Sequence, residues 1–438
     1  MNNQDHKAIE YVLRQARDND VKFIRLWFSD ILGNLKGFAI TEAELEDSLS
    51  RGMGFDASSI QGFARANFGE SDLYAVPDPH TFAILPWRPR TNSVARMFCN
   101  LYTPDGDPFD GDPRMILTKN LERASNLGFT YYVAPEIEYF YFKDSKGVEP
   151  IDTGGYFDQD TMEISTELRR ETVLMLEELG IPVESSHHEV ASSQQEIALR
   201  HTDALTMADT VMTYRHLVKE IAMKHGYYAT FMPKPITDQN GSGMHTHQSL
   251  FSGDSNVFFD ENTEDHLSPT AKHFIAGLLT HAREITAVTN QWVNSYKRLV
   301  PNFEAPTEIS WATVNKSHLI RVPEFVVGRE QSRRIEYRAP DAACNPYLTF
   351  AVMLAAGLEG IEKKYELPNS YDENNLSANN RLPDSLWEAL TVSENSPLLR
   401  KALGEATFKS FIENKKIEWE NYRSQVSKYE IDRYLPML

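Results

Sequence analysis

Several apolar segments of the chain carry charged residues at alternate positions, and this pattern constrains the fold more than any other feature. The segments are "APEIEYF" (134–140), "HHEVASSQQEI" (187–197), "MHTHQSL" (244–250) and "RRIEYRAP" (333–340). Alternate side chains of a β-strand share a face, so a strand of this kind aims its charged groups one way. A single pair such as Glu136 and Glu138 would fit the solvated face of a half-buried sheet. Carboxylates in surroundings as apolar as "TYYVAPEIEYFYF" need a compensating charge, and the repeated pattern predicts one shared polar site.

The charged groups form a mostly oxygen ligand set, which favours Mg²⁺ or Mn²⁺ over structural zinc. The candidate ligands are Glu136, Glu138, Glu189, Glu196, His245 and Glu336, and His247 and Ser249 share the strand face of His245. One Mg²⁺ that keeps its waters would not use six ligands, so we expect two ions, a common device for phosphoryl chemistry.

Arginines, whose planar fork matches carboxylate and phosphate groups, lie in the same part of the chain. They are Arg298, Arg321, Arg333, Arg334 and Arg338. The sequence has no G-x-x-x-x-G-K-[ST] and no G-x-G-x-x-G, so a bound nucleotide would not be held by a P-loop or a Rossmann turn. The residues alone therefore predict a site for metal ions, a nucleotide phosphate and an anionic small molecule.

Composition indicates which partners and which cellular compartment fit this chain. The chain of 438 residues has 44 basic against 63 acidic residues, a net charge of −19, which disfavours nucleic acid and anionic membranes as partners. Only Cys99 and Cys344 are present, which fits a reducing compartment. The first residues show no signal pattern, and the longest apolar run, "PYLTFAVMLAAGL", is too short to span a bilayer and predicts a buried helix. We expect a soluble cytoplasmic protein.

The order of patterns predicts an α+β protein with a small first domain and a large second one. A helix is expected around "KAIEYVLRQA", two strands joined at 32–34, and further strands at "TFAILPWRP" and "SVARMFCNLY". The segment 103–114, rich in Pro, Gly and Asp, suggests the domain boundary. "TELRRETVLMLEELG" predicts a helix closed by Gly180, and apolar residues from Phe408 to Val426 fall on one helical face. The final "DRYLPML" is an apolar tail that a monomer would struggle to bury.

Six motifs occur in the order and spacing of the glutamine synthetases of bacterial and archaeal type, which the chain resembles over nearly its whole length. They are "FDASSI", "APEIEYF", "HHEVASSQQEI", "KPITDQNGSGMHTHQSLF", "NSYKRLVPNFEAP" and "RRIEYRAPDAACNPYL". The resemblance implies a β-grasp domain at 1–105 and, at 106–438, a catalytic α/β domain with a curved antiparallel sheet, C-terminal helices and a tail. It also implies a dodecamer of two stacked hexameric rings, with active sites between neighbouring subunits and the tail inserted into the opposite ring.

The same resemblance implies an activity. ATP would phosphorylate the side-chain carboxylate of glutamate, and ammonia would displace phosphate from the γ-glutamyl phosphate to give glutamine, with two or more Mg²⁺ or Mn²⁺ ions per site. One ion would be held by Glu138, Glu189 and Glu196, the other by Glu136, His245 and Glu336.

The remaining site residues carry over from the motifs in the same way. Substrate binding would fall to Ser59, Asn240, Gly241, Arg298 and Arg338. The nucleotide would lie along Glu184, His247, Ser249 and Arg321. The catalytic residues would be Asp56, which with Ser59 reaches from the adjacent subunit to bind ammonium, Glu304, which closes over the acyl phosphate, and Lys316.

Some positions depart from the family pattern. Lys316 stands where an arginine usually contacts phosphate, Gln331 where many members have a nucleotide-contacting lysine, and Ala57 where the family has glycine. Tyr365 and Tyr371 do not match the modified tyrosine of the adenylylated subgroup, and Arg65 is either a feedback residue or an ordinary loop arginine.

Three alternatives to a glutamate–ammonia ligase stay open at this level. One is a relative that joins glutamate to an organic amine such as a polyamine, which retention of Asp56 and Ser59 disfavours. A non-catalytic relative would be free to lose metal ligands, and all six are present. A metal-dependent hydrolase would pair its His-x-His with further His and Asp ligands, whereas the partners here are glutamates.

Overall fold

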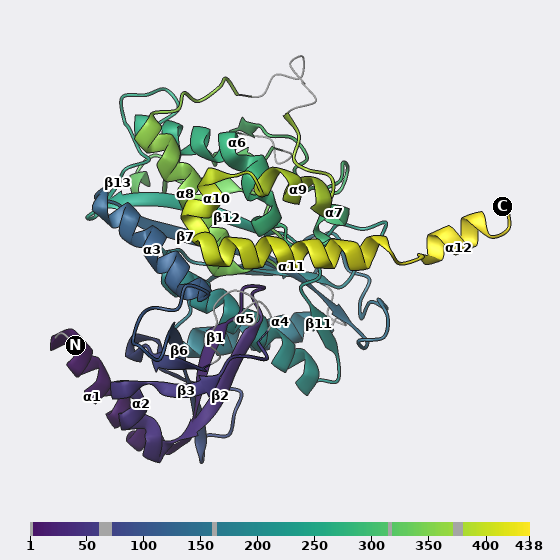
Figure 1. The fold of residues 1–438 in the computed structure, drawn as a ribbon. Coiled ribbons are helices and arrows are strands. Elements are labelled where there is room, and N and C mark those ends of the chain that lie inside the picture. The colour runs from purple at the N-terminus through teal and green to yellow at the C-terminus, as the bar shows by residue number, and fades with distance from the viewer. Residues whose placement is uncertain (1–2, 61–71, 160–163, 314–317, 371–379) are drawn as a thin grey trace.

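Two β-sheets with separate hydrophobic cores organise the chain (Figure 1). The structure, a computed structural model, describes residues 3–60, 72–159, 164–313, 318–370 and 380–438. The first sheet and its helices occupy one end of the molecule, and the elements from α3 onward form the larger body beside it.

The first sheet has the strand order β2-β1-β6-β4-β3, and the short strand β5 also pairs with β6. Its elements are α1 (Asn3–Asp18), β1 (Val21–Ser29), β2 (Leu35–Thr41), α2 (Leu45–Arg51), β3 (Met53–Asp56), β4 (Asp72–Pro77), β5 (Ala83–Ile84) and β6 (Ser93–Tyr102). β1 and β2 pair antiparallel around a turn in which Gly33 has a φ of 81°, and β1 pairs with β6 in parallel. The expected first helix and hairpin are confirmed.

The strand expected at "TFAILPWRP" is wrong for most of its length, because only the two residues of β5 pair with β6. Pro86 and Pro89 follow directly, and proline cannot donate a hydrogen bond to a neighbouring strand. The chain therefore leaves the sheet after Ile84.

Strand β6 connects the two cores through its alternating faces. Ala95, Met97, Cys99 and Leu101 belong to the core of the first sheet. On the opposite face, Phe98 belongs to the larger core and Val94 packs against it. Arg96 and Asn100 share that second face, so polar groups lie where the two parts of the chain meet.

The second sheet has the order β14-β15-β16-β12-β7-β9-β8, with the short strands β10 and β11 on β7 and β13 on β12. The strands are β7 (Thr130–Phe142), β8 (Val183–His188), β9 (Gln194–Leu199), β10 (Thr202–Asp203), β11 (Tyr228–Thr230), β12 (Met244–Ser252), β13 (Ser255–Asn256), β14 (Trp311–Ala312), β15 (Ile320–Arg321) and β16 (Ile335–Tyr337). Among the described strands, all pairs of this sheet are antiparallel apart from β14 and β15, which are parallel.

The helices of this part of the chain, apart from the last, bury apolar residues in the larger core. They are α3 (Pro113–Asn126), α4 (Ile164–Glu178), α5 (Ala204–Lys224), α6 (Pro269–Thr289), α7 (Ser295–Arg298), α8 (Pro346–Lys363), α9 (Leu386–Ser393), α10 (Pro397–Leu403), α11 (Glu405–Arg423) and α12 (Lys428–Tyr434). α8 contains "PYLTFAVMLAAGL" and is buried as expected. Its Gly360 lies against Gly277 of α6, where a Cβ would meet backbone atoms at 2.1 and 2.2 Å. Within the described residues, no helix is long and apolar enough to cross a membrane.

The C-terminal helix is shorter than its apolar pattern predicts. Phe408, Phe411 and Ile412 are buried in α11, but the helix ends at Arg423 and Val426 is exposed. Ser427 then caps α12 through a capping box, so a new helix begins. α12 projects away from the body (Figure 1). The apolar side chains of Leu435, Met437 and Leu438 that follow it are exposed, as expected for a tail that one subunit cannot bury.

Candidate active site

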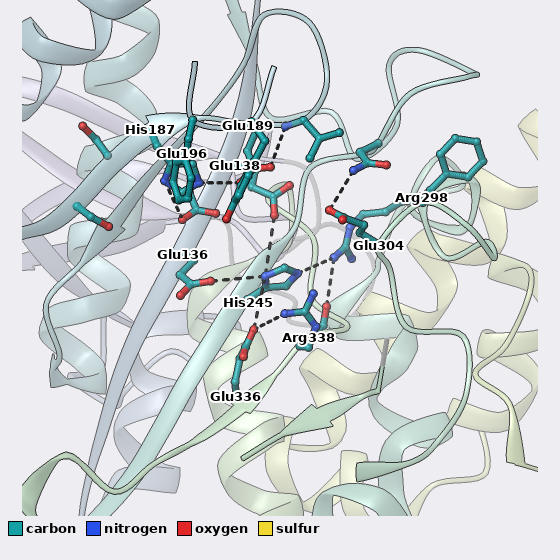
Figure 2. Close-up of a pocket in the computed structure, with 18 of the residues that line it drawn as sticks. Glu136, Glu138, His187, Glu189, Glu196, His245, Arg298, Glu304, Glu336 and Arg338 are labelled. Atoms are coloured by element: carbon teal, nitrogen blue, oxygen red, sulfur yellow. Dashed lines mark hydrogen bonds and ion pairs between the residues drawn. The ribbon is translucent and has the colours of Figure 1, made fainter. Parts of the chain in front are cut away.

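Strand register brings the charged segments together. Glu136 of β7 lies opposite His245 of β12 on one side and Ala198 of β9 on the other. Two residues along, Glu138 lies opposite Glu196. Four of the predicted ligands thus come from three adjacent strands. Figure 2 shows these side chains pointing toward one another.

The two remaining carboxylates, Glu336 and Glu189, come from segments on either side of these three strands. Glu336 of β16 pairs with His247 of β12. Glu189 follows the end of β8 and receives a hydrogen bond from Val190 N at 3.0 Å. All six predicted metal ligands line one cavity of about 540 Å³. The cavity is also lined by Asn240, Gly241, Arg298, Glu304, Arg321 and Arg338.

The imidazole of His245 faces three of the carboxylates. Its Nδ1 lies 3.6 Å from Glu136, 3.7 Å from Glu336 and 4.0 Å from Glu138. Burial, with the nearby Arg338 charge, lowers the pKa of His245 to about 4. The ring is therefore neutral at pH 7 and has a lone pair to offer a metal ion.

Carboxylates outnumber the cations that could balance them. Burial, followed by the Glu189 charge, raises the pKa of Glu138 to about 8. Burial and the neighbouring glutamates also raise the pKa of Glu196. Burial alone would raise the pKa of Glu136, but hydrogen bonds from His245 and His247 lower it. Such an excess of buried acidic groups is the arrangement that divalent cations stabilise.

Two groups of three residues could each hold a metal ion, because the ligand atoms within each group lie within 4.8 Å of one another. The first group is Glu136, His247 and Glu336, and the second is His187, Glu189 and Glu196. Each set differs from the expected one by one residue, with His247 in the place of His245 and His187 in the place of Glu138. His187 Nε2 is 2.9 Å from Glu189 Oε1. Sequence reasoning missed His187, although it lies two residues from Glu189 and thus follows the same period-two pattern.

The guanidinium of Arg298 is held beneath the cavity by main-chain carbonyls. The side chain is 2% exposed, and its Nη1 donates to Ala339 O at 2.7 Å while its Nη2 donates to Arg338 O at 3.2 Å. Gly243 passes so close that a Cβ there would lie 2.6 Å from Arg298 Nη2. This glycine therefore lets the main chain approach the arginine.

Glu336 organises the other two arginines of the cavity. It is fully buried and accepts hydrogen bonds from Arg321 and, at 2.5 Å, from Arg338 Nη1. By contrast, Arg333 donates to Pro323 O and Asp265 O and does not line the cavity. Its prediction as an anion-binding residue is wrong, because it alternates with Glu336 on the other face of the segment.

The loop that carries Glu304 has a strained backbone. Asn302 and Glu304 have φ values of 70° and 54°, which non-glycine residues rarely adopt. Asn240 Nδ2 donates to Glu304 Oε2 at 3.2 Å, and the ring of Phe303 lies 3.5 Å from Lys234 Nζ. Strain of this kind concentrates at functional loops.

Gln194 is a second residue that sequence reasoning missed. Its side chain is fully buried, and its Nε2 donates to Glu138 Oε2 at 2.9 Å and to Gly241 O at 3.0 Å. It thus joins the carboxylate cluster to the "NGSG" loop. No local pattern signals this role, because the partners lie 56 and 47 residues away.

Of the four predicted nucleotide-binding residues, Arg321 lines the cavity, whereas His247, Ser249 and Glu184 do not. His247 Nε2 lies 2.9 Å from Glu136 and its Nδ1 accepts from Arg334. Ser249 follows on the same face of β12, and Glu184 is exposed on β8, outside the cavity lining. Gln331 accepts a hydrogen bond from Asn256 N, which ties it to β13.

Other predicted residues do not reach this cavity within one chain. Asp56 and Ser59 are exposed in the first domain, where Asp56 accepts from Ser58 N. Lys316, Arg65 and Tyr371 lie outside the described residues.

The whole chain is similar to known proteins. The family model "Glutamine synthetase, beta-Grasp domain" matches residues 20–104, and "Glutamine synthetase, catalytic domain" matches residues 110–434. The first of these matches confirms the β-grasp fold expected for the first sheet.

Similar proteins include the glutamine synthetases of Mycolicibacterium smegmatis (53% identical, covering 98% of this chain and 99% of that one) and Methanosarcina mazei (48%, covering 98% of each). Among solved structures, "GmaS/ADP complex-Conformation 1" superposes with a TM-score of 0.87 at 32% identity, covering 97% of this chain and 99% of that one.

Proposed function

The chain belongs to the glutamine synthetase family of ATP-dependent ligases, and we propose that it makes glutamine from glutamate, ammonia and ATP through a γ-glutamyl phosphate. One observation carries the proposal: Glu136, Glu138, Glu189, Glu196, His245 and Glu336 converge in one cavity with Arg298, Arg321 and Arg338. Relatives at 48–53% identity are named glutamine synthetase, which favours ammonia over an organic amine as the nucleophile.

We assign the six ligands to two or more Mg²⁺ or Mn²⁺ ions, because the cavity supplies oxygen donors, a neutral imidazole and an excess of negative charge. When bound, the ions would neutralise charge on the phosphates of ATP. Arg298 and Arg338 would hold the glutamate carboxylates, together with Asn240 and Gly241. Arg321, His247, Ser249 and Glu184 would lie along the nucleotide, and Lys316 would contact the transferred phosphate.

Glu304 is assigned to the closing of the site. Its loop lies over Asn240, and closure there would exclude water from the acyl phosphate, which otherwise hydrolyses. A carboxylate near the incoming nucleophile can also accept its proton.

Asp56 and Ser59 would complete the site of a neighbouring subunit by binding ammonium. Their exposure in the single chain supports this, as does the unburied tail after α12, which needs a partner surface. We therefore propose a cytoplasmic homo-dodecamer of two hexameric rings, in which residues 1–105 and 106–438 form the two domains.

The function is tested by phosphate release from ATP with glutamate and a panel of nucleophiles, from ammonium to methylamine and diamines. We expect turnover with ammonium. Activity with a larger amine alone would overturn the proposal.

Replacement of Asp56 by alanine is expected to raise the KM for ammonium about tenfold or more, with the KM for glutamate changed less than about twofold, since a single carboxylate favours the cation. Asp105→Ala is a matched control, because Asp105 is an exposed aspartate of the same domain. Equal loss for both substrates would remove Asp56 from this role.

Binding of Mn²⁺ is expected to release on the order of one proton per subunit at pH 7, because metal ligands bind deprotonated. The pKa of Glu138 is raised to about 8, so this carboxyl is protonated at pH 7 and must ionise to bind the ion. The release should diminish as pH rises through 8. Calorimetry in two buffers of different ionisation enthalpy measures it, and Glu138→Gln should release less. Heats that do not depend on the buffer would contradict the assignment.

A further inference from the structure

A second cavity, of about 430 Å³, lies between the two domains and shares no lining residue with the active site. Its walls come from β6, from the turn after β4, from the segment between α4 and β8, and from the start of α5. Small-molecule sites often form at such domain boundaries. None of the roles assigned above uses this space.

Arg96 is a buried cation of this cavity with an unpaired hydrogen-bond donor. It lies on the face of β6 that is directed to the catalytic domain, and it is 7% exposed. Its Nη1 donates to Thr81 O, its Nε has no hydrogen-bond partner, and it makes no ion pair among the described residues. The rings of Phe98 and Trp27 lie 4.9 and 5.9 Å from the guanidinium carbon. Burial lowers the pKa of Arg96 to about 10, so the side chain stays charged at neutral pH.

The carboxylates of the cavity wall are already engaged by another arginine. Arg114 donates to Asp209 at 2.9 Å and to Asp78 at 2.8 Å. Asp209 also accepts from Tyr347 OH at 2.6 Å, and Asp78 accepts from His80 N at 3.0 Å. These oxygens are directed to Arg114 and its neighbours, and none forms a hydrogen bond with Arg96.

The rim of the cavity adds more positive or protonatable groups. Arg200, His80 and His201 line it and are exposed to solvent. A buried guanidinium with unused N–H donors is costly unless a hydrogen-bonding partner compensates its charge. An oxyanion matches the planar donor fork of arginine better than water does.

We propose that this interdomain cavity binds a small oxyanion, either inorganic phosphate or the carboxylate of a small organic acid, through Arg96 with Arg200 at the rim. The volume accommodates an organic acid of a few carbon atoms. A ligand held there contacts elements of both domains and stabilises their association. The inference does not depend on the ligase assignment, because it rests on residues outside the active site.

The test is thermal unfolding of the full chain with increasing phosphate or succinate, at constant ionic strength, in four proteins. Wild type is expected to show a saturable rise in Tm. Arg96→Gln should weaken the binding at least about tenfold, in line with the loss of charge-assisted hydrogen bonds, and Arg200→Gln should weaken it about threefold. Arg90→Gln is the matched control, because Arg90 is an exposed arginine that pairs with Glu178 and does not line this cavity.

Binding of either anion in the active site leaves the comparison intact, because Arg96 and Arg200 do not line that cavity. The anion with the lower dissociation constant shows whether the site prefers inorganic phosphate or a small organic carboxylate. Identical anion responses in all four proteins would overturn the proposal. If Arg96→Gln does not fold, Arg200→Gln decides it, since a response equal to that of wild type would refute the site.

Discussion

Replacement of Glu336 by alanine is expected to lower ligase turnover about a thousandfold, the upper range for removing one preorganised polar group from an active site. Glu336 is fully buried and accepts hydrogen bonds from Arg321 and Arg338, so its loss leaves two cations without their shared partner. It also removes one of the carboxylates that face His245 Nδ1. Turnover and the affinity for Mn²⁺ should therefore fall together.

Two variants sharpen this experiment. Glu336→Gln keeps the shape of the side chain, so a comparable loss of turnover would show that the negative charge is required. Glu122→Ala, at an exposed position of α3, should behave as wild type. Turnover and Mn²⁺ affinity that survive in Glu336→Ala would exclude this residue from the metal site.

A single methyl group at position 243 is expected to lower kcat/KM for glutamate about a hundredfold, the size of effect that a misplacement of about 1 Å can cause. The Cβ of Gly243→Ala would lie 2.6 Å from Arg298 Nη2 and 3.1 Å from His245 Nε2. Arg298 cannot yield freely, because the carbonyls of Ala339 and Pro340 hold its guanidinium. The backbone of Gly243 is not in the left-handed region, so the substitution acts on the neighbouring side chains and not on the local fold.

Steady-state kinetics with varied glutamate, beside a circular dichroism spectrum and Tm, separate these effects. Gly147→Ala is the matched control, since a Cβ there meets no atom within 4 Å. A normal kcat/KM for glutamate in Gly243→Ala would argue against Arg298 as a glutamate-binding residue.

The alternating segments predicted the strands of the site because a two-residue period needs only local sequence. The pairing of those strands was not predictable in the same way. Glu138 meets Glu196 across 58 residues of chain, and Gln194 reaches Gly241 across 47. Such contacts depend on the register and curvature of the folded sheet, which a local pattern does not encode.

Two predicted elements were too long, and in both cases the sequence contains the local cause. The prolines at 86 and 89 explain why β5 is short, and the capping residue Ser427 explains why α11 does not extend to Val426. Arg333 illustrates a different cause, because closeness in sequence to Arg334 and Arg338 does not place its side chain on their face. Alternation places it on the face opposite Glu336, where it binds main-chain carbonyls.

The pairing of β12 with both β7 and β16 has a consequence for how this chain can change in length. Inserting one residue within β12 would rotate the two histidines into the hydrophobic core and turn Thr246 and Gln248 toward the acidic groups. Single-residue insertions or deletions in this strand should therefore abolish activity, whereas the exposed connection at 144–147 should tolerate them. A deletion scan of the coding sequence would show this as a sharp gap in tolerance centred on β12.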